Sequence, residues 1–251
     1  RGFLLVAPVL PLERWRSFAL PTPMATCQTA LPLAVTVFDA TGAAVAHRPL
    51  GPLPRDHATL VDVDLLLAEA GATLASGGGH IELSYDQAVA GPKDGWFHAL
   101  FRYQARHAAH AADTSFGSHL FNLPVTYRDE PQSYAGAPPG LSTRLFLRLG
   151  AEAETTTFCH LIYPASGPWH ARSTTTLTLH DRRGAAVARV ELAISINGSR
   201  HVRVDEAFGA ADLARATGGW VLVRDETCRL FGYHGLSRPN AAFSLDHMFG
   251  F

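Results

Sequence analysis

The feature that most constrains this chain is an internal repeat with a spacing of about 140 residues. Residues 33–46 have the pattern of a strand, an Asp-x-x-Gly turn and a second strand, and residues 175–188 have the same pattern. The Asp of each turn can accept hydrogen bonds from its own backbone, and the Gly can adopt a positive φ. Four further pairs follow in the same order: 59–64 with 200–205, 79–83 with 219–223, 98–103 with 228–233, and 115–121 with 243–249. Five matches in one order indicate a duplicated unit.

The pattern inside each copy predicts a mostly β fold. Apolar and polar residues alternate with a period of two in segments 81–83, 177–179 and 202–204, as they do in half-buried strands. Turn signals recur about every ten residues, which is typical of sandwiches and barrels. We therefore expect two duplicated β-sandwich units with short helices, related by a pseudo-two-fold axis. A single closed sheet built from both halves is the alternative.

The expected units are residues 1–126 and residues 142–251. Between them, residues 127–141 are rich in Pro and Gly, a composition typical of linkers. The chain has 251 residues, of which 47% are hydrophobic, so it has enough apolar surface to bury a core.

Two short helices are expected, at residues 65–70 and 207–216. Each follows an alternating segment that ends on an Asp, Asp64 or Asp205, and an Asp at that position can cap a helix. Residues 101–112 have two interpretations. Ala and Arg favour a third helix there, whereas the repeat indicates that the segment begins as a strand.

The charge content argues against several classes of function. The net charge is −1 and the pI is about 7.0, so no overall field attracts nucleic acid. No apolar run reaches the ~18 residues of a membrane span. Charged residues make up only 17%, which suits a homo-oligomer whose surface is partly covered. Three widely spaced cysteines form no zinc or disulfide motif, so we expect a reducing, cytoplasmic location.

Histidine is abundant, with 13 residues in the chain. His107 and His110 are three residues apart, and they would share a face if residues 101–112 were helical. With His98 and His119 nearby in sequence, they form a candidate site for a divalent transition metal. The alternative is an exposed loop, rich in Ala and His, that binds nothing.

A second candidate site involves ligand-binding aromatic and imidazole groups. His119 and His247 are expected to occupy matching places in the two copies, surrounded by Phe side chains that would lower the His pKa by desolvation. Trp96 and Trp169 are the tryptophans best suited to stack on a small molecule or glycan. Ordinary packing is the alternative for all four residues.

No recognised catalytic motif is present. Cys159 and His160 are adjacent, but neighbouring residues on a strand point to opposite faces and cannot act on each other. The leading hypothesis is therefore a non-catalytic binding or assembly protein with a ligand groove at the seam of the two repeats. The alternative is a metal-dependent enzyme that uses the histidines of the first repeat, because the second repeat lacks counterparts of His107 and His110.

Overall fold

The computed structural model describes most of the chain, namely residues 5–23, 30–75, 78–86, 88–89, 94–121, 142–150, 154–164 and 170–248. Of residues 23, 31, 94–96 and 118–121 it describes the backbone alone. The described residues are mostly strand, with three short helices, so the predicted β character is confirmed. The predicted linker at 127–141 lies entirely outside the described residues. Within the described part, no helix is long and apolar enough to cross a membrane.

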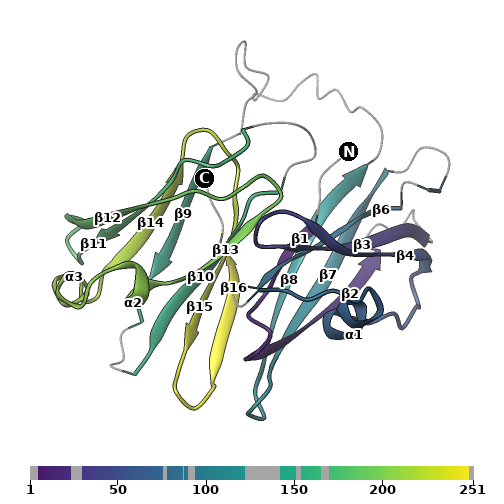
Figure 1. The fold of residues 1–251 in the computed structure, drawn as a ribbon, viewed down its shortest axis with the longest axis horizontal. Helices are drawn as coiled ribbons and strands as arrows, with labels where there is room; N and C mark the ends of the chain where they lie inside the picture. Colours follow the sequence, from purple (N-terminus) through teal and green to yellow (C-terminus); the bar gives the residue numbers. More distant parts are fainter. Residues whose placement is uncertain are drawn as a thin grey trace.

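The first half of the chain occupies one side of the molecule, at the right of Figure 1. Its elements are β1 (Leu5–Val9), β2 (Trp15–Pro23), β3 (Ala30–Asp39), β4 (Ala44–Pro54), β5 (Val61–Asp62), α1 (Val63–Glu69), β6 (Gly79–Tyr85), β7 (Asp94–Ala105) and β8 (Ala111–Phe121).

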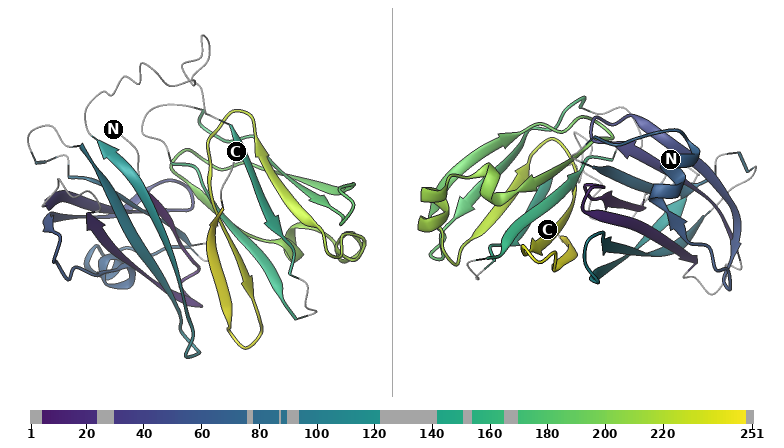
Figure 2. Two further views of the ribbon diagram at one scale, coloured as in Figure 1. Left: turned by 180° about the vertical axis from the view of Figure 1, so that it is seen from behind. Right: turned by 60° about the horizontal axis from the view of Figure 1, so that its bottom comes forward.

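The second half lies beside the first in all three ribbon views (Figures 1 and 2). Its elements are β9 (Thr143–Arg148), β10 (Thr156–Ile162), β11 (Thr175–His180), β12 (Ala186–Leu192), β13 (Ser199–Arg203), α2 (Val204–Ala207), α3 (Ala210–Arg215), β14 (Trp220–Asp225), β15 (Phe231–Ser237) and β16 (Phe243–Met248).

The strands form four antiparallel sheets of four strands each. The first half contains sheet A, with the order β1-β6-β3-β4, and sheet B, with the order β5-β2-β7-β8. The second half contains sheet C, with the order β12-β11-β14-β9, and sheet D, with the order β13-β10-β15-β16. Adding eight to each strand number of sheet A gives the order of sheet C, and adding eight to each strand number of sheet B gives that of sheet D. The two halves therefore have the same strand order. The described strands do not join into one closed sheet, and that alternative is wrong.

The two Asp-x-x-Gly turns have the same geometry, as predicted. The Oδ1 atom of Asp39 accepts hydrogen bonds from the backbone of the turn, and Gly42 has a φ of 96°. The Oδ1 atom of Asp181 accepts equivalent hydrogen bonds, and Gly184 has a φ of 88°. The adjoining β3–β4 and β11–β12 pairs also each shift register just before the turn. The likeness of the halves therefore extends to local backbone irregularities.

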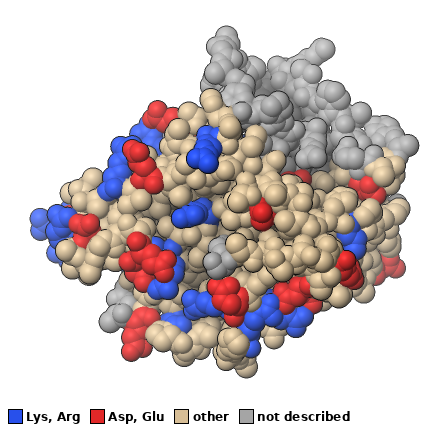
Figure 3. Space-filling model, viewed as in Figure 1, with Lys and Arg blue, Asp and Glu red and all other residues tan. Residues whose placement is uncertain are grey.

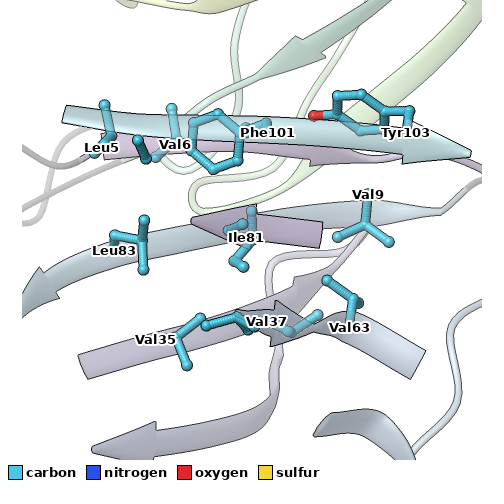
Figure 4. Packing of buried hydrophobic residues seen from close by; sticks show 14 of the residues in the cluster. Leu5, Val6, Val9, Val35, Val37, Val63, Ile81, Leu83, Phe101 and Tyr103 are labelled. Carbon is cyan, nitrogen blue, oxygen red and sulfur yellow. The ribbon is translucent and has the colours of Figure 1, made fainter. Parts of the chain in front are cut away.

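The described residues form two hydrophobic clusters, one centred on each half. Figure 4 shows Phe101 and Tyr103 of β7 facing Ile81 and Leu83 of β6 across the core of the first half. A separate cluster joins sheets C and D in the second half. Burying each large apolar side chain contributes about 1.5–3 kcal/mol. The core of the first half also includes residues from β10, β15 and β16, so the halves pack against one another.

The two predicted helices required correction, and of the two interpretations of residues 101–112 the strand is the right one. Helix α1 begins at Val63, and its N-cap is Asp62 rather than Asp64, because the Asp62 side chain accepts from the first-turn backbone. The region 207–216 contains α3 but is preceded by a separate short helix, α2, whose N-cap makes no side-chain hydrogen bond. Residues 101–112 form the β7–β8 hairpin and are not helical. Pairing with two neighbouring strands outweighs the helix propensity of Ala and Arg there.

Candidate ligand-binding site

The seam is the contact between the two halves, made by β1, β6 and β8 on one side and by β10, β13, β15 and β16 on the other. Trp15 of β2 lies in it and is only 3% exposed. Its ring centroid is 6.1 Å from that of Phe158 and 5.8 Å from that of Phe243. Aromatic pairs at these separations contribute beyond their buried area, so the seam resembles a core rather than a loose domain contact.

Strand β1 is held in the seam by one tyrosine from each half. The Tyr103 hydroxyl donates to the backbone oxygen of Pro8 at 3.1 Å, and the Tyr233 hydroxyl donates to that of Val6 at 2.5 Å. Burial raises the pKa of both tyrosines, so both hydroxyls keep their protons and remain donors. These bonds satisfy carbonyls on an edge strand that would otherwise be buried without a partner.

A row of polar rings crosses sheet D on the face that contacts the first half. His201, His160, Tyr233 and His247 lie directly opposite one another on β13, β10, β15 and β16. The centroids of the His160 and His201 rings are 5.8 Å apart, and those of the Tyr233 and His247 rings are 5.2 Å apart. Opposed residues of adjacent strands share a face, so strand pairing alone assembles this row.

His80 of β6 approaches the row from the first half. His80 and His160 are both fully buried, and neither ring nitrogen of either has a hydrogen-bond partner among the described residues. Burial lowers the pKa of His80 to about 3, and the charge of Asp39 opposes this shift. Burial also lowers the pKa of His160 well below its usual value, helped by the charges of His201 and His80. The nearby Gly79 backbone opposes the lowering of the His160 pKa, but it is not placed to form a hydrogen bond with the His160 ring.

The pKa values of His201 and His247, the two outer members of the row, are also lowered. Burial lowers the pKa of His201 to about 4, and the charges of Arg14 and Arg203 add to the effect. Burial also lowers the pKa of His247, against the opposing charge of Asp246. The seam therefore holds these imidazoles in their neutral form at neutral pH, where their main role is packing.

A pocket of about 520 Å³ lies where the first half meets the end of β9 and the β15–β16 hairpin of the second half. One wall is His110 of the first half, and the second half supplies residues from the end of β9, from β15 and from the start of β16. The described lining contains no Asp or Glu, and its polar and aromatic residues include His110, Arg148, Thr155, His234, Arg238 and Phe243. Arg148 and Arg238 make this lining basic, which favours an anionic occupant.

The two imidazoles of the pocket are held by backbone contacts. His110 Nε2 lies 2.6 Å from the backbone oxygen of Phe243, which assigns the proton to Nε2 because a carbonyl can only accept. His234 contacts the Arg148 backbone, and its Nε2 is buried with no partner among the described residues. Burial lowers the His234 pKa, opposed by this backbone contact and by Asp246. The ring therefore donates to the Arg148 backbone through Nδ1, and Nε2 carries no proton and can only accept a hydrogen bond.

The three predicted metal ligands whose side chains are described, His98, His107 and His110, do not come together. His98 lies opposite Gly117 on the β7–β8 hairpin, whereas His107 is exposed in the turn and His110 follows it. With a strand rise of about 3.3 Å per residue, His98 is roughly 20 Å along the hairpin from His110. The side chain of His119 is not described. Among the described residues, no group of three His, Cys, Asp or Glu side chains could hold a metal ion.

Of the four predicted ligand-binding residues, only His247 has a described side chain. His247 lies in the seam with its ring stacked on Phe116 at 4.6 Å. It does not match His119, because Tyr233 pairs with His247 whereas the equivalent Tyr103 pairs with Ala112. The side chain of Trp96 and the whole of Trp169 lie outside the described residues.

The residues around the pocket gave no signal in the sequence. Arg148, His234 and Arg238 are isolated basic residues at the ends or in the middle of strands, and only the meeting of β9, β15 and β16 brings them together. The expected separation of Cys159 from His160 is confirmed, because Cys159 packs in the core of the second half and burial raises its pKa to about 12. Comparisons of the chain with protein families, curated proteins and solved structures found no match.

Proposed function

We propose that this chain is an internal duplication of an eight-stranded β-sandwich unit, and that it binds a small anionic molecule in the seam pocket. The common strand order of the two halves supports the duplication, and so do the matching turns and register shifts. Strands β8 and β16, which hold equivalent positions, contact each other across the seam. Contact between equivalent elements is typical of a two-fold relation.

The observation that carries the binding proposal is the basic lining of the pocket. Arg148 can donate two parallel hydrogen bonds to a carboxylate or phosphate, and Arg238 adds a second positive charge to the lining. The neutral ring of His234 can accept a hydrogen bond at Nε2 from a hydroxyl group of the bound molecule, and the ring of Phe243 adds an apolar wall. The volume of about 520 Å³ lies within the range of small-molecule sites. On the face seen in Figure 3, acidic and basic residues are interspersed, so we attribute anion selectivity to the pocket rather than to the overall charge.

The test is calorimetric titration with inorganic phosphate, glucose 6-phosphate, succinate and neutral glucose. We expect the anions to bind and glucose not to bind. Arg148→Ala should weaken binding by tenfold or more, since a charged hydrogen bond contributes about 1.5–3 kcal/mol. Arg144→Ala is the matched control, because Arg144 lies on the same strand but stacks over Phe146 outside the pocket. Equal affinity in the wild type and the Arg148 variant, or no binding of any anion, would overturn the proposal.

A further inference from the structure

Strand β12 is an open edge of sheet C. It pairs with β11 on one side and with no described strand on the other. Its counterpart in the first half, β4, is the edge of sheet A and carries Pro49, Pro52 and Pro54. Proline has no N–H and interrupts pairing, which protects an edge from strand addition. Strand β12 contains no proline, so of these two equivalent edges it is the one that can accept another strand.

The charged residues of β12 would form ion pairs with those of a second, antiparallel copy of the same strand. Arg189 and Glu191 are both exposed, and they share a face because they are two residues apart. Neither makes an ion pair with any residue in the described ranges. If a second β12 pairs antiparallel about Val190, Arg189 of each copy lies opposite Glu191 of the other.

On the opposite face of β12, apolar residues of the two copies would meet in the same register. Ala188, Val190 and Leu192 are partly buried against the core of the second half. In the arrangement centred on Val190, Val190 faces its own copy and Ala188 faces Leu192. The pairing therefore extends the apolar layer on one face of the sheet and forms two charge pairs on the other. Opposed pairs of both kinds stabilise antiparallel strands.

We propose that two copies of this chain associate through β12, so that their two C sheets join into one antiparallel sheet of eight strands. The partner is a second copy of this chain because the charge pattern and the apolar pattern of β12 are both symmetric about Val190. Arg215 of α3 donates to the Val187 backbone oxygen at 3.4 Å, and the register shifts near the start of β12. Pairing is thus confined to residues 188–192. Such an interface is small, and the dimer forms weakly, with a Kd of roughly micromolar or higher.

The test is sedimentation velocity of the full chain from about 1 μM to about 1 mM. We expect a concentration-dependent monomer–dimer equilibrium. Arg189→Glu and Glu191→Arg should each raise the Kd by about tenfold or more, because each replaces two attractive pairs with two repulsive ones. The double variant, which carries both changes, should restore the wild-type Kd. Arg182→Glu is the control, since Arg182 is exposed in the preceding turn and the change in charge is the same.

Amide hydrogen exchange of the wild-type chain provides a test that does not depend on the folding of any variant. Exchange should slow in residues 188–192 as the concentration rises, while exchange in β4 stays the same. A chain that is monomeric throughout the range would overturn the proposal, and so would a dimer unaffected by the single charge reversals. Neither readout involves the seam pocket, so the outcome is independent of anion binding.

Discussion

Lowering the pH from 8 to 5 should strongly destabilise this protein because of the buried histidines in the seam. The pKa of His80 is about 3 and that of His201 about 4 in the folded state, and that of His160 is also well below its ordinary value. In the unfolded chain each has a pKa of about 6.5. Between the folded and unfolded pKa values, the unfolded state binds protons that the folded state does not. Stability therefore falls as the pH drops below about 6.5.

The size of the effect follows from the same values. At pH 5 each of the three histidines loses about 2 kcal/mol relative to pH 8, because about 1.5 pH units below 6.5 correspond to about 1.4 kcal/mol each. The total loss is about 6 kcal/mol. Domains are stable by only about 5–15 kcal/mol, so the protein should be close to its unfolding transition at pH 5.

The assay is urea denaturation followed by tryptophan fluorescence at intervals between pH 8 and pH 5. Below pH 6 the free energy of unfolding should approach a slope of about 4 kcal/mol per pH unit. His80→Leu should reduce that slope by about 1.4 kcal/mol per pH unit, and His201→Phe serves the same purpose if the first variant folds poorly. His107→Gln is the control, because His107 is exposed in a turn. A flat profile for the wild type, or a slope unchanged in both seam variants, would refute the reasoning.

Three further predictions concern stability and reactivity. Gly42→Ala and Gly184→Ala both place a side chain at a positive φ, at a cost of about 1–2 kcal/mol. Gly42→Ala should cost about 1–3 kcal/mol more, because its Cβ would lie 2.3 Å from a backbone oxygen of the other half. Equal thermal denaturation midpoints of the two variants would contradict this. Tyr233→Phe should destabilise the chain by about 1–3 kcal/mol in chemical denaturation, since it leaves the Val6 carbonyl without its hydroxyl donor. Cys159 should resist iodoacetamide at pH 8 in the folded protein and react after denaturation, as read by mass spectrometry, because its buried thiol has a pKa of about 12.

The sequence alone determined the local features of the fold. The Asp-x-x-Gly turns could be predicted because Asp39 and Asp181 bond to their own turns and Gly42 and Gly184 take positive φ values. These interactions span only four residues, so they need no information about distant parts of the chain. The alternation of apolar residues likewise predicted strands, since a strand buried on one face imposes a period of two.

Tertiary structure decided between the two interpretations of residues 101–112, and it alone decided both sites in the seam. Alanine-rich sequence favours a helix in isolation, but residues 101–105 pair with β2 and β8, and residues 111–112 pair with β7, so both segments are strands. His80 and His160 are far apart in the chain, and they come close only because sheet D packs on the first half. The same packing places His110 opposite Arg148 and His234 to form the pocket. No local pattern encodes which faces of two sheets meet, because that choice depends on the fit of whole surfaces.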